Sequence, residues 1–204
     1  SRITDAIYEA GFNSTGRFYE QSKEILGMTP SEYRKAGSGQ AIQFAVAECS
    51  LGHVLVAATE IGVCAVLLGD EPQALIDDLE QRFSSAKIDL ADPGFEATVE
   101  AVISVIEAPS KGCSLPLDIR GTAFQNLVWR ALRSIPPGQT LSYSELASAL
   151  GKPTASRAVA GACAANQIAV LVPCHRIVRG DGSISGYRWG VQRKKELLRR
   201  EALE

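Results

Sequence analysis

Apolar residues along the chain alternate in one region and recur at helical spacing in others. Ile42, Phe44 and Val46 occupy every second position, as in a half-buried strand. Two further apolar runs cover 53–59 and 63–68, and turn-forming residues precede each of them. This pattern predicts a meander of three strands.

Two amphipathic helices are predicted after the meander, over 72–83 and 95–107, where apolar residues recur three and four positions apart. Helices that follow a small sheet cover its apolar surface, so residues 41–118 are expected to form an α/β unit. This region contains neither a nucleophile constellation nor a glycine-rich phosphate loop. Its pattern therefore favours a supporting role.

The region from 119 to 204 is predicted to be mainly helical. Capping boxes at Thr122–Gln125 and Ser142–Glu145 open two helices. A third helix is predicted from about residue 154 to 165, and six of residues 157–166 are Ala or Gly. Such a thin helix either packs tightly against another helix or enters a groove of nucleic acid. Since it has almost no long polar side chains, the second interpretation favours sequence-independent contact through the minor groove.

Residues 1–36 have the spacing of short helices joined by glycine-containing turns. The segment AIYEAGFNSTGRFYEQSKEILGMTPSEYR resembles the second helix-turn-helix of AraC-type transcription regulators. This resemblance implies a partial DNA-reading module at 1–36. The Gly- and Ser-containing stretch that follows predicts a linker over 37–40.

Composition places the chain among ordinary globular proteins, and its charge is unevenly distributed. The length of 204 residues fits one to two domains, and no apolar run approaches the ~20 residues of a membrane span. Residues 41–119 contain 3 Lys and Arg against 13 Asp and Glu, whereas 120–204 contain 13 against 5. The basic half is typical of a polyanion-binding surface, although solvated faces of opposite sign would give the same count.

Cysteine usage argues against disulfides and structural metal. There are five cysteines, an odd number, with no CxxC pair and only two histidines. This argues against a zinc ribbon and against a disulfide framework, so we expect no metal and a reducing cytoplasm as the location. The five positions are Cys49, Cys64, Cys113, Cys163 and Cys174.

Cys174 is the one cysteine with a chemically active neighbourhood in the sequence. The other four lie among core-like residues, where a cysteine is usually an inert small hydrophobe. Cys174 ends an apolar run and is followed at once by His175 and Arg176. Cationic neighbours can lower a thiol pKa and generate the nucleophilic thiolate. Because adjacent side chains of an extended chain point in opposite directions, contact between Cys174 and His175 requires a turn or a bridging water.

The segment Pro173-Cys174-His175-Arg176-Ile-Val resembles the signature of the O6-alkylguanine-DNA alkyltransferases, the methylated-DNA–protein-cysteine methyltransferases. Residues at matching distances support the resemblance over about 41–204, weakly in the first half and strongly in the second. With the AraC-like start, the chain resembles the C-terminal part of Ada-type adaptive-response regulators. We therefore expect it to be a piece of a longer protein.

The resemblance implies a role for each matched residue. Its implied catalytic residues are the nucleophile and its supporting groups: Cys174, His175, Glu201, Tyr143 and Asn166. Its implied DNA-binding residues are Arg157, Ala158, Ala162, Arg176 and Tyr187. Its implied substrate-binding residues are Val170, Val172, Tyr187 and Trp189. The large Trp189 replaces smaller residues of several relatives, so it either narrows the alkyl pocket or packs against the last helix.

The implied fold is a small ribonuclease H-like sheet with helices at 41–118, followed by a helical, winged-helix-like domain at 119–204. The implied function is irreversible transfer of an alkyl group from O6-alkylguanine in double-stranded DNA to Cys174, after flipping of the nucleotide. Its extension to O4-methylthymine is also expected. We expect a monomer that acts without cofactor or membrane. Two alternatives stay open at this stage: a DNA-binding regulator without transferase activity, and a cysteine hydrolase.

Overall fold

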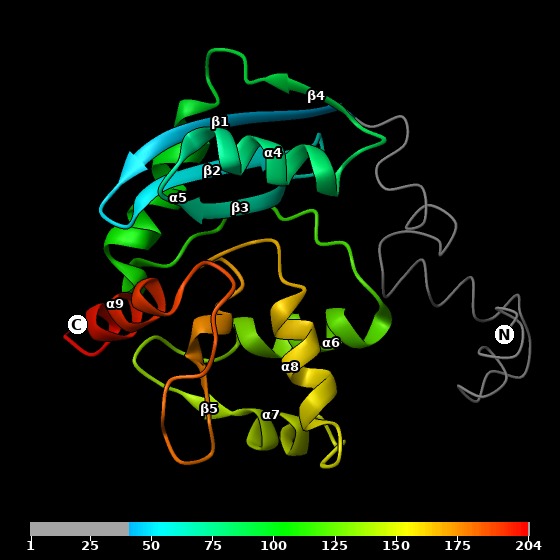
Figure 1. Cartoon of the computed structure of the whole chain (residues 1–204), viewed down its shortest axis with the longest axis vertical. Coiled ribbons are helices and arrows are strands. Elements are labelled where there is room, and N and C mark those ends of the chain that lie inside the picture. Colours follow the sequence, from blue (N-terminus) through cyan, green and yellow to red (C-terminus); the bar gives the residue numbers. More distant parts are fainter. Residues whose placement is uncertain (1–40, 204) are drawn as a thin grey trace, which may run out of the picture.

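The computed structural model describes residues 41–203. The predicted helix-turn-helix at 1–36 and linker at 37–40 lie outside the described residues. Figure 1 shows two parts: a sheet with two helices, here called the sheet part (41–107), and a group of short helices, the helical part (123–201). No helix of the described residues is long and apolar enough to cross a membrane.

The sheet part is built on the predicted meander. Strands β1 (Ala41–Cys49), β2 (Gly52–Ala58) and β3 (Val63–Gly69) pair antiparallel in chain order. A fourth strand, β4 (Lys87–Leu90), pairs parallel with β1, so the sheet order is β3-β2-β1-β4. The prediction of three strands was therefore wrong by one. β4 has four residues and two of them are charged, so its period was too short to detect.

Two helices cover opposite faces of this sheet. Helix α4 (Pro72–Arg82) contacts β2 and β3, and helix α5 (Glu96–Glu107) contacts β1 and β2. In Figure 1, α4 lies in front of the strands and α5 behind them. Both helices were predicted to within one residue at each end. With helices on both faces, β3 is buried along nearly its whole length and β2 over its central residues, which explains their continuous apolar runs.

The helical part contains the predicted helices at shifted bounds. Both predicted capping boxes are present, at Thr122 and at Ser142. Two very short parallel strands were missed, because two residues carry no period. The elements are α6 (Ala123–Arg133), β5 (Leu141–Ser142), α7 (Tyr143–Ala149), α8 (Ser156–Ala164), β6 (Ile177–Val178) and α9 (Val191–Glu201). Residues 41–203 also contain two 3-10 turns, η1 (Pro109–Lys111) and η2 (Cys174–Arg176).

The free edge of β3 joins the two parts. The Val66 amide donates to the Gln167 carbonyl, and the Ala169 amide donates to the Val66 carbonyl, both at 2.9 Å. Val63 forms a similar bridge with Leu117. The segment that leads into Cys174 is thus attached to the sheet, and one apolar core runs through both parts.

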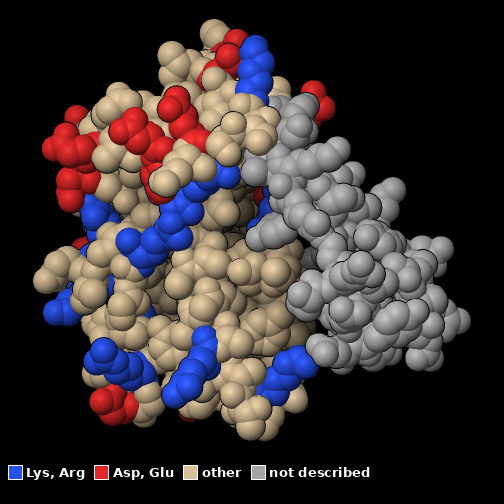
Figure 2. All heavy atoms as spheres, turned by 45° about the vertical axis from the view of Figure 1, so that its right-hand side comes forward, with Lys and Arg blue, Asp and Glu red and all other residues tan. Residues whose placement is uncertain are grey.

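The acidic and basic regions of the sequence correspond to the sheet part and the helical part. Figure 2 shows acidic side chains gathered over the sheet part and separate Lys and Arg side chains over the helical part. The exposed cations of the helical part include Arg130, Lys152 and Arg157. Electrostatic attraction of a polyanion is therefore expected at the helical part rather than at the sheet.

Candidate active site

Cys174 begins the 3-10 turn η2 and is buried, with 5% of its surface exposed. Its amide donates to the Val172 carbonyl at 2.8 Å, which closes a tight turn just before the thiol. Asn166 Nδ2 donates to Cys174 Sγ at 3.3 Å. A donor directed at sulfur favours the thiolate over the thiol.

Asn166 also holds the segment that carries the cysteine. Its side chain donates to the Val172 carbonyl at 2.9 Å and accepts from the Ile168 amide at 2.9 Å. Val170 lies between these two contacts and has a φ of +58°, a left-handed conformation that a β-branched residue rarely adopts. Within residues 41–203 it is the one non-glycine residue with positive φ. Asn166 therefore stabilises a strained bend on which the position of the thiol depends.

His175, Arg176 and Glu201 form a buried cluster next to Cys174. His175 Nε2 and Glu201 Oε1 lie 2.8 Å apart, and Arg176 Nε and Nη2 donate to the same carboxylate at 3.0 and 2.9 Å. The Gly138 amide donates to Glu201 Oε2 at 3.2 Å. Burial raises the pKa of Glu201, but the hydrogen bonds from His175 and Arg176 outweigh it and hold the pKa at about 2. Glu201 is therefore an anion.

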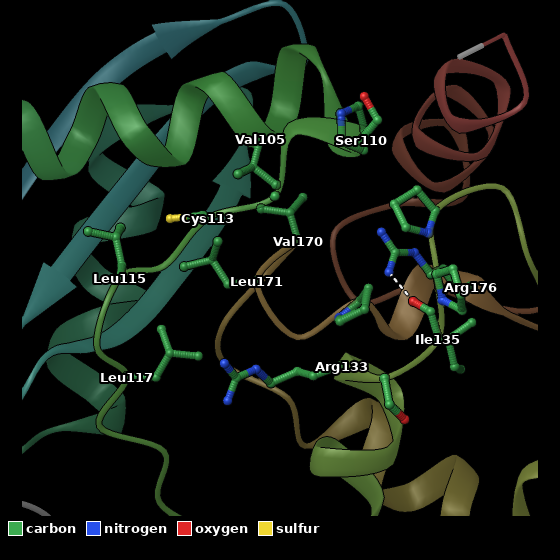
Figure 3. Close-up of a pocket in the computed structure, with 16 residues that line it drawn as sticks. Val105, Ser110, Cys113, Leu115, Leu117, Arg133, Ile135, Val170, Leu171 and Arg176 are labelled. Carbon is green, nitrogen blue, oxygen red and sulfur yellow. Dashed lines mark hydrogen bonds between the residues drawn. The ribbon is translucent and has the colours of Figure 1, made fainter.

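The position of Arg176 is inconsistent with the DNA contact predicted for it. Its guanidinium is buried, pairs with Glu201 and donates to the Ile135 carbonyl at 2.5 Å. Figure 3 shows this last bond as a dashed line. Since all of these partners are internal, Arg176 neutralises Glu201 rather than a phosphate.

Burial decides the resting protonation of the site. It raises the pKa of the Cys174 thiol to about 11, against the smaller opposing effects of Asn166 and Lys194. The sequence-based prediction that His175 and Arg176 lower the Cys174 pKa was wrong, because both side chains are directed at Glu201. Burial also lowers the pKa of His175, although Glu201 opposes it. The resting pair is a neutral thiol beside a neutral imidazole.

Tyr143 belongs to a chain of polar groups that ends at a buried lysine. Its Oη donates to Ser185 Oγ at 2.8 Å, and Lys194 Nζ donates to the same oxygen at 2.8 Å. Lys194 is fully buried and also donates to the Ile177 carbonyl. Neither Ser185 nor Lys194 was predicted. A lysine at an apolar helical spacing gives no sign of burial in the sequence, since lysines are almost always exposed.

Tyr187 and Trp189 stack beside His175. The Tyr187 ring makes edge-on contacts with the His175 ring, at a centroid distance of 6.4 Å and an angle of 82°, and with the Trp189 ring, at 5.1 Å and 68°. Among the described residues, the buried Tyr187 Oη, Trp189 Nε1 and His175 Nδ1 have no hydrogen-bond partner. Two aromatic side chains whose polar atoms have no hydrogen-bond partner suit the binding of a flat heteroaromatic ring with polar edges.

Helix α8 presents only part of its small residues to solvent. Arg157 and Ala158 are exposed, as are Gly161 and Ala164. Ala162, predicted to bind DNA, is buried, and its carbonyl accepts from Trp129 Nε1 at 2.9 Å. One face of the thin helix therefore packs against α6, as the first interpretation predicts, and the other face is exposed. The prediction for Ala162 is inconsistent with its position, because the helical period turns it toward α6.

Val172 is not free to contact a substrate through its backbone. Its amide donates to the Ile168 carbonyl, and its carbonyl accepts from both Asn166 and Cys174. Both lone pairs of that carbonyl are used, which is inconsistent with the guanine contact predicted for Val172. Val170 is buried too, and its left-handed backbone supports the bend described above.

A separate cavity of about 280 Å³ lies between the two parts of the molecule. Figure 3 shows Val105, Cys113 and Leu115 on one side and Arg133, Ile135 and Arg176 on the other. Pro173 lines it but Cys174 does not. This cavity, here called the rear cavity, therefore lies next to the segment that carries Cys174 but is not lined by the thiol itself. No group of three potential metal ligands occurs within residues 41–203, and all five cysteines are free.

Comparison with known proteins identifies the family. Residues 123–203 match the model of the 6-O-methylguanine DNA methyltransferase DNA-binding domain. The chain is 52% identical over 200 residues to the bifunctional transcriptional activator/DNA repair enzyme Ada of Escherichia coli, covering 98% of this chain and 56% of that protein. It is 37% identical over 144 residues to the inducible methylated-DNA–protein-cysteine methyltransferase of Bacillus subtilis, covering 70% of this chain and 80% of that one.

Solved structures agree with these sequence matches. The crystal structure of Mycobacterium tuberculosis OGT in complex with DNA has a TM-score of 0.64 and 30% identity, covering 80% of this chain and 93% of that chain. The chain therefore belongs to the methylated-DNA–protein-cysteine methyltransferase family. It spans little more than half the length of the Escherichia coli relative.

Proposed function

We propose that this chain repairs DNA by moving the alkyl group of O6-alkylguanine onto Cys174 Sγ. The observation that carries the proposal is the buried arrangement of Asn166, Cys174, His175 and Glu201, in which a thiol has a hydrogen-bond donor on sulfur and a neutral imidazole as its neighbour. This is the equipment for transient deprotonation of a nucleophile.

The proton path begins at His175. Because the Glu201 carboxylate accepts a hydrogen bond from His175 Nε2, the neutral imidazole carries its proton on Nε2, and Nδ1 has the free lone pair. Nδ1 takes the thiol proton, directly or through one water, and the Glu201 anion stabilises the imidazolium. Sulfur then attacks the alkyl carbon in line, a carbon–sulfur bond forms, and the bond from that carbon to guanine O6 breaks.

The leaving guanine needs a proton in exchange. Tyr143 is the proposed donor, and Ser185 and Lys194 hold its hydroxyl in place. Tyr143 later regains a proton from solvent and the imidazolium loses one, so the net change is a thiol proton replaced by an alkyl group. A thioether is a stable end point with no good leaving group. The protein is therefore consumed by one reaction and needs no cofactor.

DNA is proposed to bind along the exposed face of α8. Ala158, Gly161 and Ala164 let this helix approach the minor groove closely, and Arg157 fills the stack after the damaged nucleotide has flipped out. Tyr187 and Trp189 then line the pocket for the flipped base. The polar atoms that these two side chains leave open support this placement.

The remaining parts of the proposal concern organisation. We propose a ribonuclease H-like unit at 41–118 and a winged-helix-like unit at 119–204, for which β5 and β6 provide a small wing. O4-methylthymine is proposed as a second substrate, and the unit is proposed to act as a cytoplasmic monomer. The AraC-like segment at 1–36 and the similarity to the bifunctional transcriptional activator/DNA repair enzyme Ada of Escherichia coli favour a second function, transcription regulation, for the longer protein.

Peptide mapping tests the proposed reaction directly. The protein is incubated with a duplex that contains one O6-methylguanine, and its peptides are examined for added methyl. Methyl on the peptide with Cys174, and its loss in Cys174→Ser, is the expected result. Free methanol with unmodified protein indicates a hydrolase, and DNA binding with neither product indicates a regulator without transferase activity.

A further inference from the structure

Helix α9 supplies two groups of the proposed site, and both lie on its buried face. Lys194 and Glu201 are seven residues apart, two helical turns, so they point the same way. Glu201 contacts His175, while Lys194 contacts Ser185. The geometry of the proton path therefore depends on where α9 lies.

Two arginines on an adjacent face of α9 reach across to the sheet part. Arg193 and Arg200 are also seven residues apart, and both contact the turn between β1 and β2. Figure 1 shows α9 beneath this turn and beneath the end of α5. In neither arginine is more than 16% of the side-chain surface exposed, although their acidic partners Asp70 and Glu107 lie at the surface.

Arg200 makes the denser set of contacts. Its Nη2 donates to Ser50 Oγ at 2.8 Å, and its Nη1 donates to the Ile106 carbonyl at 2.8 Å and to Glu107 Oε2 at 3.1 Å. Glu107 in turn accepts from the Ser50 amide and hydroxyl at 3.0 and 2.7 Å. Glu196 completes the arrangement by accepting from Arg200 Nε at 2.9 Å.

Arg193 makes a second, parallel attachment. Its Nε donates to the Leu51 carbonyl at 2.8 Å, and its Nη2 pairs with Asp70 Oδ1 at 2.5 Å. It also donates to the carbonyl of Trp189, which lines the proposed pocket, at 2.9 Å. A planar guanidinium donates several hydrogen bonds in a fixed geometry, so each arginine fixes both the orientation of α9 and its distance from the turn. A lysine, with a single ammonium group, cannot do this.

We propose that Arg200, with Arg193, is a positioning residue: it ties α9 to the β1–β2 turn and so sets the distance between Glu201 and His175. The sheet part, which has no reacting group of its own, thereby acts on the chemistry. This inference rests on the proposed alkyl transfer. A displacement of a catalytic group by about 1 Å is enough to slow a reaction by up to two orders of magnitude.

Single-turnover transfer from a methylated duplex tests the role of Arg200. In Arg200→Ala we expect the limiting rate to fall about tenfold, with an unchanged DNA concentration for half-maximal rate, because α8 is untouched. Arg200→Lys keeps the charge but not the fork and should recover only part of the rate. Arg199→Ala is the matched control, since the neighbouring Arg199 is exposed and pairs only with Glu196.

The pH profile separates positioning from mere stability. His175 is faced by Glu201 and Lys194 of α9 and by Arg176 of its own turn. If Glu201 moves, it no longer stabilises the His175 imidazolium, and deprotonation of the thiol then depends more on hydroxide. The transfer rate of Arg200→Ala should therefore approach that of the unmodified protein as pH rises. A loss of folded protein would instead lower the final amount of methyl accepted and leave the rate of the active fraction unchanged at every pH.

A double-mutant cycle with Glu107→Gln completes the test. Because Arg200 and Glu107 are in contact, the double variant should be no slower than Arg200→Ala alone. Equal rates in Arg200→Ala and Arg199→Ala, or a deficit that is the same at all pH values, would overturn the proposed positioning. Absence of transfer in the unmodified protein would instead refute the proposed function.

Discussion

Two buried thiols, Cys64 in the sheet part and Cys174 in the helical part, differ in what their sulfur atoms meet. Burial raises the pKa of Cys64 to about 12 and that of Cys174 to about 11. Cys64 donates to the Ala57 carbonyl at 3.5 Å, a contact that favours the thiol. Cys174 accepts from the Asn166 amide and has His175 and the charge of Lys194 nearby. Both thiols are buried, so the groups around sulfur are what distinguish the proposed nucleophile from a packing cysteine.

The largest expected difference between the two thiols is in alkyl acceptance. Cys174→Ser should abolish methyl transfer but retain DNA binding, because the proposed binding surface lies on α8. Cys64→Ala should transfer at a rate within about twofold of the unmodified protein, since the Cys64 sulfur donates to a backbone carbonyl of the sheet part. Transfer of labelled methyl from a duplex measures both, and comparable losses in the two variants would refute the contrast.

The next effect concerns the base beside Cys174. We expect His175→Gln to slow transfer about a hundredfold, the usual scale for loss of a general base. Because the thiol pKa is about 11, the variant should regain rate as pH rises and thiolate forms without assistance. Single-turnover rates between neutral and alkaline pH measure this recovery. A deficit that stays constant over that range would exclude His175 as the base.

A smaller effect separates access to Cys174 from its reactivity. Arg157→Ala should slow repair in duplex DNA about tenfold, while transfer from the free methylated base stays unchanged, since only the duplex requires flipping. Arg133→Ala is the control, because Arg133 is an exposed arginine that lines the rear cavity. Equal losses on both substrates would contradict the flipping role of Arg157.

The smallest effect is on stability in acid. The Glu201 pKa is about 2 in the folded protein and 4.5 as its ordinary value, so its stabilising contribution is full above 4.5 and is lost as pH falls toward 2. This contribution is on the order of 3 kcal/mol. Urea unfolding between pH 5 and 2 measures this contribution. As pH falls, the free energy of unfolding should therefore decrease less in Glu201→Gln than in the unmodified protein. Parallel curves for the two proteins would show that Glu201 is not held as an anion.

Local features of the fold could be predicted from the sequence, and long-range ones could not. The caps at Thr122 and Ser142 involve residues three apart, so their patterns are visible in the chain. β4 has too few residues for a detectable period, and its pairing with β1 depends on a partner more than forty residues away. Segment patterns do not specify such pairings, because they form only when the whole sheet assembles.

The same distinction applies to the site. The PCHR segment identified Cys174, yet the partner of Arg176 lies 25 residues away and that of Tyr143 lies 42 away. Arg176 was therefore predicted to face DNA, and Ser185 was not predicted at all. Ala162 was assigned to the DNA surface because all small residues of α8 look alike in sequence. Only its packing against Trp129 distinguishes its face of the helix.

Titration of the protein with an excess of methylated duplex tests the central claim most directly. The amount of methyl transferred is measured against the amount of protein, with chelator present and no cofactor added. The account predicts a plateau at one methyl per chain, located on Cys174, because the thioether has no route back to a thiol. Continued transfer beyond one equivalent would mean that the thiol is regenerated, and would contradict the irreversible acceptor mechanism.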